Sequence, residues 1–128
     1  MSLSARISRT VPRSVRQERP GDSKAHLAMI RRLPCCLTGC GSHGDAHHLL
    51  NVHDGAPKGV GRKNEDRWTV PVCRAHHDAA HAAGNDESWF AGQGVQVRDL
   101  AMALWRNRDS EEACHRLVDR VKQRVNAL

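Results

Sequence analysis

The sequence predicts a small α+β domain built on a strand–loop–strand–helix unit and held together by metal ions. Between residues 46 and 83, two short β-favouring runs flank a long glycine-containing loop, and an alanine-rich helical run follows. The stretch "CRAHHDAAH", residues 73–81 at the start of this helical run, places one cysteine and three histidines in nine positions. The aromatic residues are only three tryptophans and one phenylalanine, and the mean hydropathy is −0.62. A chain with so few large apolar residues often needs a metal or a disulfide to hold its fold.

The first predicted element is a short helix over residues 24–33. Ser23 is suited to cap its N-terminus, and Pro34 ends it because the residue before a proline disfavours helical backbone. A run of glycine, serine and aspartate then indicates a tight turn. A strand over 46–52 and a long loop over 53–67 are expected to follow.

The second strand is predicted over residues 68–72. The helical run over 74–83 is expected to end at Gly84, since glycine favours the backbone that terminates a helix. Two more helical stretches are predicted over 86–94 and 97–108. The middle of the chain is therefore expected to form a ββα unit with further helices after it.

A last helix is predicted after Asp109, which is expected to cap it together with Glu112. Its predicted apolar stripe comprises Ala113, Leu117, Val121, Val125 and Leu128. We divide the chain into a disordered basic arm over 1–22, a metal-stapled domain over 23–108 and a C-terminal amphipathic helix over 109–128. This helix is expected to pack on the domain or on a partner.

Positive charge is concentrated at the N-terminus. Residues 1–32 hold eight Lys or Arg residues and two acidic residues, so they account for the whole formal charge of +6. Residues 1–22 are rich in Arg, Ser and Pro and lack apolar periodicity, which predicts disorder in the free protein. A basic arm suits a polyanion, most often a nucleic acid; the alternative is a solvated tail that only aids solubility.

The sequence predicts a cytoplasmic protein with reduced thiols. It has no apolar run of about 18 residues, and its N-terminus lacks the apolar segment of a secretory signal. In a reducing compartment, clustered cysteines favour zinc over disulfides, and the odd number of five cysteines agrees with this. Cys114 lies beside the apolar stripe of the last helix and is expected to be a core thiol.

The cysteines and histidines supply two sets of metal ligands. The first set joins Cys36 and Cys40, in the turn before the first strand, to Cys73 and His76 at the start of the helix. Three thiolates and one imidazole make a closed, structural zinc site. Cys35 competes with Cys36 for the first position, and the sequence leaves both open.

The second set is centred on His77 and His81. At positions i and i+4 of a helix, their side chains share one face and are close enough to hold one ion. One residue of the pair His47-His48 would complete the set, because adjacent residues of a strand point to opposite faces. Three imidazoles leave coordination positions open, as a catalytic metal requires. The remaining histidines lack such a context and are expected at the surface: His26, His43, His53 and His115.

These motifs resemble the HNH, or ββα-metal, endonuclease superfamily. The closest likeness is to a small bacterial and phage branch related to a phage recombination-enhancement nuclease. The similar stretch runs from "HLAMIRRLPCC" through "DAHHLL" and "GRKNEDRWTVPVCRAHHDAAHAAG" to "LAMALW", over residues 26–105. The resemblance implies a ββα-metal core with a zinc-stapled hairpin and flanking helices.

The resemblance also implies roles for the ligand sets. In this superfamily the first strand carries a metal ligand followed by the general base, and these positions correspond to His47 and His48. The helix supplies the remaining ligands, at positions that match His77 and His81. Zinc-stapled members add two pairs of ligands around the hairpin, which match the first set: Cys36, Cys40, Cys73 and His76. The superfamily's middle Asn has no clear counterpart in this sequence.

The activity implied by the resemblance is that of a metal-dependent endonuclease acting on DNA. His48 would take a proton from the attacking water, while Mg²⁺, Mn²⁺ or Zn²⁺ at the open site would stabilise the scissile phosphate. Basic residues of the inter-strand loop and of the arm would hold neighbouring phosphates: Lys58, Arg62, Lys63, Arg67, Arg13 and Arg16. The expected partner is duplex or single-stranded DNA. The expected location is a bacterial cell, whether the protein is encoded by the bacterium or by a phage. A recombinase or another DNA-processing protein is a candidate second partner.

The alternative function is a non-catalytic zinc-binding module that binds nucleic acid. Such a module needs only the closed zinc set. It has no use for His48, His77 and His81, so their presence favours the enzyme.

Overall fold

A two-stranded antiparallel sheet lies at the centre of the molecule. The computed structural model describes most of the chain: residues 19–38, 40, 44–52 and 63–126. Strand β1 (Asp45–His48) pairs with β2 (Thr69–Val72). The Leu49 N–H donates to the Trp68 carbonyl at 2.8 Å, so the pairing continues past the end of β1. The second strand starts one residue later than predicted, because Asp66–Trp68 form the 3-10 helix η2.

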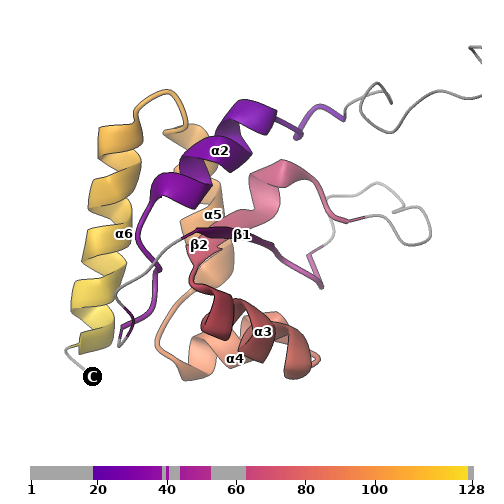
Figure 1. Ribbon diagram of the computed structural model, residues 1–128, viewed down its shortest axis with the longest axis vertical. Coiled ribbons are helices and arrows are strands. Elements are labelled where there is room, and N and C mark those ends of the chain that lie inside the picture. Colours follow the sequence, from indigo (N-terminus) through magenta and orange to yellow (C-terminus); the bar gives the residue numbers. More distant parts are fainter. Residues whose placement is uncertain (1–18, 39, 41–43, 53–62, 127–128) are drawn as a thin grey trace, which may run out of the picture.

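Helices surround this sheet, as Figure 1 shows: α2 (Lys24–Arg32), α3 (Arg74–Ala82), α4 (Asp86–Gly92), α5 (Val97–Arg106) and α6 (Glu111–Asn126). Helix α2 packs against both strands, whereas α5 contacts β2 and η2 and packs along α6. Helices α3 and α4 lie together at one end of the sheet. The fold is therefore a mixture of helices and a small antiparallel sheet, which confirms the predicted α+β class. Across the described residues, no helix is both long and apolar enough to span a membrane.

Helix α6 packs on the domain itself, against α5 and the core. Val121 is buried as predicted, and Leu117 and Val125 pack against the core. The most enclosed positions are Cys114 and Val118, both 0% exposed. The buried stripe is therefore rotated from the predicted one, and it includes the thiol that the sequence placed in the core.

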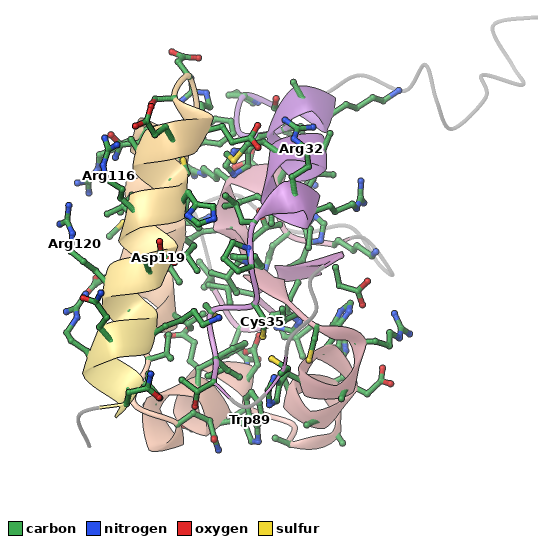
Figure 2. All side chains as sticks on the ribbon, turned by 60° about the vertical axis from the view of Figure 1, so that its left-hand side comes forward. Arg32, Cys35, Trp89, Arg116, Asp119 and Arg120 are labelled. Carbon is green, nitrogen blue, oxygen red and sulfur yellow. The ribbon has the colours of Figure 1, made fainter. Side chains whose placement is uncertain are left out.

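The start of α6 also differs from the prediction. Ser110, rather than Asp109, caps the helix, since its Oγ accepts from the Ala113 N–H at 3.2 Å. A salt bridge ties this helix end to α2: the guanidinium of Arg32, labelled in Figure 2, lies 2.8 Å from Glu111 Oε1. The cap at Ser110 begins α6, and the salt bridge joins that end of α6 to the end of α2.

Residues 19–22 belong to the folded domain, which corrects the predicted boundary of the disordered arm at residue 22. The Gly21 N–H donates to Glu65 Oε2, and the Arg67 N–H donates to the Gly21 carbonyl, both at 2.8 Å. A Cβ atom at position 21 would lie 2.7 Å from Glu65 Oε1, so a larger residue here would have to displace the Glu65 side chain. The other residues of the predicted arm, 1–18, lie outside the described residues.

His26 is a core residue, which corrects the prediction of a surface position. Its side chain is 2% exposed, and its ring packs edge-on against Trp105 with centroids 5.0 Å apart. Neither ring nitrogen has a hydrogen-bond partner among the described residues. Burial, followed by the nearby charge of Arg108, lowers the pKa of His26 to about 4. Of the other histidines expected at the surface, His115 is exposed, and two lie outside the described residues: His43 and His53.

Candidate functional site

Three thiols and one imidazole converge between the segment after α2 and the start of α3. The Sγ atoms of Cys35, Cys40 and Cys73 lie 3.4, 3.6 and 3.2 Å from His76 Nδ1. All four ligand atoms lie within 4.8 Å of one another. Around a tetrahedral zinc with bonds of roughly 2.0–2.3 Å, neighbouring ligand atoms are about 3.3–3.7 Å apart. This thiol cluster could therefore hold a structural metal such as zinc.

The structure corrects one predicted ligand: Cys35, not Cys36, belongs to the thiol cluster. The Cys36 N–H donates to the Pro71 carbonyl at 3.0 Å, so this segment runs beside β2. Adjacent residues of an extended segment point to opposite sides. Cys36 is therefore turned into the core at 0% exposure, while Cys35 is turned toward His76. Figure 2 shows Cys35 on the segment that follows α2.

The first turn of α3 shapes the electrostatics of the thiol cluster. Burial raises the pKa of Cys73, but the backbone N–H groups of His76 and Ala75 and the thiols of Cys40 and Cys35 outweigh it. The pKa of Cys73 is therefore lowered. For Cys40, burial and then its hydrogen bonds with Cys35 and Cys73 raise the pKa to about 12. A cation among the thiols favours every thiolate, so metal binding at this cluster releases protons.

A second cluster forms where β1 meets α3. His77 and His81 lie one turn apart on α3, and their Nε2 atoms are 3.2 Å from each other. His47 reaches them from β1, with ring centroids 5.1 and 5.2 Å away. One nitrogen of each ring lies within 4.8 Å of the other two, so this histidine cluster could also hold a metal. Burial and then the neighbouring histidines lower the pKa of His81, which favours its neutral, ligating form.

His47 presents one free ring nitrogen inside the protein. The residue is 0% exposed, and its Nε2 lies 2.8 Å from Asp86 Oδ2. Its Nδ1 is buried without a hydrogen-bond partner in the described part of the chain. A buried polar atom without a partner is costly, and a cation shared with His77 and His81 would remove that cost. The donor set therefore fits a metal ion, with His47 rather than His48 as the ligand from β1.

Two carboxylates orient these histidines, and neither was predicted from the sequence. Asp86, 0% exposed, accepts from His47 and from the Leu50 N–H, each at 2.8 Å. Burial raises the pKa of Asp86, but these hydrogen bonds outweigh it and lower the pKa. Asp45 Oδ2 lies 2.8 Å from His77 Nδ1, and this bond lowers the pKa of Asp45. Each carboxylate holds a proton on one ring nitrogen and leaves the other nitrogen for a metal.

A cleft of about 300 Å³ opens beside the histidine cluster. Its lining includes two of the cluster's histidines, His77 and His81, together with His48. The basic side chains of Lys63 and Arg74 also line it. The structure therefore brings the predicted base, two of the predicted metal ligands and two cations to one cavity.

Side chains from the segment before β2 hold the end of β1 at this cleft. His48 Nε2 lies 2.9 Å from Asp66 Oδ1. Asn64, 9% exposed, lines the cleft and donates from its amide to the Leu49 carbonyl at 2.6 Å. Asn64 therefore ties the end of the inter-strand loop to the residue that follows His48.

Two of the predicted phosphate-binding residues lie in the described chain. Lys63 is exposed at the cleft, as expected. Arg67 does not line the cleft: it lies over the Trp68 ring at 5.4 Å and pairs with Glu65 at 3.1 Å. Arg74 lines the cleft without having been predicted. The remaining predicted phosphate-binding residues lie outside the described residues: Lys58, Arg62, Arg13 and Arg16.

The stretch that carries both clusters and the cleft also identifies the family. A family model described as a protein of unknown function, DUF968, matches residues 12–108, which is more than half of the chain. The chain belongs to the DUF968 family. Comparisons with curated proteins and with solved structures gave no significant match. The DUF968 match covers every residue of the thiol and histidine clusters and ends before α6.

Proposed function

We propose that this DUF968 protein is a metal-dependent endonuclease that hydrolyses phosphodiester bonds in DNA. The observation that carries the proposal is the composition of the cleft. His48, the histidine pair of α3 and the cations Lys63 and Arg74 line one cavity. A base, a metal centre and groups that bind phosphate are the parts that this reaction needs.

The order of the elements supports a ββα-metal core of the HNH type. β1 and β2 form a hairpin, and α3 follows β2 directly. The histidine cluster draws one ligand from β1 and two from α3. Asn64 precedes β2 and bonds to the backbone just after His48, which suits it for the role of that superfamily's middle Asn.

The histidine cluster is the proposed catalytic metal site, with His47, His77 and His81 as ligands. A divalent cation bound there supplies Lewis acidity toward the scissile phosphate and toward the charge that develops on the leaving oxygen. Asp86 and Asp45 hold the imidazoles in the orientation that the cation requires. The thiol cluster is the proposed structural zinc site.

His48 is the proposed general base. Its Nε2 is engaged by Asp66, so Nδ1 is the nitrogen that can accept a proton from water. As that proton moves, the water oxygen bonds to phosphorus and the bond from phosphorus to the 3′ oxygen breaks. The leaving oxygen then takes a proton from solvent. Lys63 and Arg74 would pair with phosphate oxygens and hold the strand in register.

Incubation with supercoiled plasmid and with single-stranded DNA tests this function. Each substrate is combined with Mg²⁺, Mn²⁺ or Zn²⁺, and with a chelator. We expect cleavage that depends on the added metal and that the chelator stops. If protein with both clusters loaded cleaves neither substrate with any of the three metals, the non-catalytic zinc-binding module is favoured instead.

Three histidine variants separate the proposed roles. His48→Ala should keep its metal and its fold but lose about 10²- to 10⁴-fold in cleavage rate, the usual contribution of a general base. His81→Ala should lose metal at the histidine cluster and regain some activity in excess metal. His115→Ala, on the exposed face of α6, is the control and should cleave normally. If all three cleave like the wild type, the activity comes from a contaminant.

A further inference from the structure

One carboxylate joins His48 to a turn near the N-terminus of the described chain. Asp66 Oδ1 lies 2.9 Å from His48 Nε2, and the two side chains are only 16% and 13% exposed. The second carboxylate oxygen, Oδ2, accepts from the Ser23 N–H at 3.0 Å. Asp66 therefore has both oxygens engaged, one by the imidazole and one by the backbone before α2.

Further hydrogen bonds hold this turn against the segment that carries Asp66. The Asp66 N–H donates to Asp22 Oδ1 at 3.2 Å. The Gly21 N–H donates to Glu65 Oε2, and the Gly21 carbonyl accepts from the Arg67 N–H, both at 2.8 Å. The two segments are more than 40 residues apart in sequence. They form a small clamp, which we define as residues 19–23 together with 65–67.

We propose that Asp66 is a positioning residue for His48, held in place by the Ser23 N–H on its second carboxylate oxygen. This inference rests on the proposed nuclease function, which makes His48 the base. A carboxylate only accepts hydrogen bonds, so Asp66 requires the proton of the neutral imidazole to sit on Nε2. Nδ1 then keeps its lone pair for water. Because Ser23 holds the other oxygen, Asp66 cannot turn away without losing a bond.

Asp66→Asn tests the inference, since it keeps the size of the side chain and removes one acceptor. The Ser23 N–H is a backbone donor that still needs the amide oxygen. The amide NH₂ then faces His48 Nε2, and that nitrogen has to become an acceptor. The imidazole proton moves to Nδ1, which is the nitrogen that water needs free.

Glu65→Gln is the matched control. Glu65 also holds the turn through one backbone N–H, that of Gly21, but it has no hydrogen bond to His48. A purely structural role for Asp66 predicts that the two variants behave alike. A positioning role predicts that only Asp66→Asn affects the base.

Two readouts on the zinc-loaded, full-length protein decide between these roles. The first is the tautomer of neutral His48, read from its ring nitrogens by NMR and assigned with a His48→Gln sample. We expect the Nε2–H form in the wild type and in Glu65→Gln, and mainly the Nδ1–H form in Asp66→Asn. The second is cleavage, where Asp66→Asn should lose about 10²-fold in kcat with little change in KM, and Glu65→Gln should keep its kcat.

The outcomes also separate this inference from the nuclease proposal. An Nδ1–H tautomer in the wild type, or the same tautomer in all three proteins, overturns the positioning role whether or not the protein cleaves DNA. The expected tautomers in a protein that cleaves nothing support the hydrogen bond but overturn the nuclease. If Asp66→Asn does not fold, Asp66→Ser takes its place, since a hydroxyl can still accept from Ser23 while leaving His48 without its partner. Loss of the Nε2–H preference is then the expected result.

Discussion

Two histidines of the proposed catalytic site are each presented by one acidic side chain. Nε2 of His47 is hydrogen-bonded to Asp86, which leaves Nδ1 for the cluster. Nδ1 of His77 is hydrogen-bonded to Asp45, which leaves Nε2 for the cluster. The two rings would therefore offer opposite nitrogens to a metal. A carboxylate on the far nitrogen holds the ring in one tautomer and raises its basicity toward a metal.

Asp86→Asn should weaken metal binding at the histidine cluster by about 10- to 100-fold, because the ring of His47 loses a charged partner. Glu87→Gln is the control, since Glu87 is the next residue on α4 and pairs with Arg98 at 2.7 Å instead. Chelator competition on zinc-loaded protein measures both affinities. Equal affinities in the two variants would show that Asp86 does not tune the metal site.

His26 gives the fold a dependence on acid that is separate from either metal site. Its pKa is lowered from an ordinary value of 6.5 to about 4, first by burial and then by the charge of Arg108. Between pH 6.5 and about 4, His26 is protonated in the unfolded chain but stays neutral in the native protein. Stability is therefore lost as the pH falls from about 6.5 toward 4, and is fully present above that range.

His26→Phe should remove this dependence. Between pH 7 and pH 5, the wild type should lose about 2 kcal/mol of unfolding free energy that the variant keeps. Urea denaturation of both proteins at the two pH values measures this difference in unfolding free energy. The metal ligands are the same in both proteins, so their contributions cancel in the comparison. His115→Gln, at an exposed position, should follow the wild type. A His26→Phe protein with the wild-type pH dependence would mean that His26 titrates normally in the fold.

At the scale of elements, the thiol cluster brings together the segment after α2 and the junction of β2 with α3. Cys35 and Cys40 come from the segment after α2, whereas Cys73 and His76 lie where β2 turns into α3. These elements share a small core with few aromatic residues. A metal in the cluster would therefore add binding energy to the folding of the domain.

Cys35→Ser and Cys36→Ser form a matched pair that tests this contribution. Cys35→Ser should lose the tightly held zinc and lower the melting temperature by at least about 10 °C. Cys36→Ser buries a hydroxyl in the core and should cost about 1–3 kcal/mol while keeping its zinc. Metal analysis and thermal melting of the two proteins provide the comparison. Zinc loss in Cys36→Ser with zinc retained in Cys35→Ser would reverse the ligand assignment.

For the molecule as a whole, the charge excess is divided equally between residues 1–18 and the first folded segment, residues 19–32, at +3 each. Residues 1–32 hold the whole formal excess of +6, and the rest of the chain is balanced. The clamp shows that residues 19–23 form part of the fold, so they cannot serve as a free arm. The segment that could bind DNA without affecting the fold is therefore residues 1–18.

Removal of residues 1–18 deletes four arginines and one glutamate, a net loss of three positive charges. The melting temperature should stay the same. On duplex DNA, the slope of log affinity against log salt should become shallower by up to about 0.9 for each phosphate that the arm neutralises in the full-length protein. Binding measured across a salt series gives the slope. An unchanged slope would make the arm a solubilising tail.

A longer deletion, of residues 1–22, provides the contrast. It also removes Gly21 and Asp22 from the clamp, so Glu65 Oε2 loses its hydrogen bond from the Gly21 N–H and the Asp66 N–H loses its acceptor. This deletion should lower the melting temperature, whereas the shorter one should not. Identical melting curves for the two deletions would show that the clamp contributes nothing to stability.

Local geometry was readable from the sequence. His77 and His81 share a helix face because residues four apart always do, and Ser23 caps α2 because its hydroxyl reaches the His26 N–H at 3.1 Å. The hairpin, the helix after it and the order of the ligands follow from patterns that span only a few residues. The charge of the N-terminal segment follows from composition alone.

The tertiary structure decided what depends on how distant segments meet. Cys35 rather than Cys36 joins the thiol cluster because the hydrogen bond from the Cys36 N–H to the Pro71 carbonyl sets the rotation of that segment. Asp86 reaches His47 across 39 residues, and no periodicity in the sequence connects them. A neutral ring such as that of His26 can be enclosed or exposed at similar helical positions, and only the packing of Trp105 against it settled which. Contacts of this kind depend on the relative placement of whole elements, which no local pattern encodes.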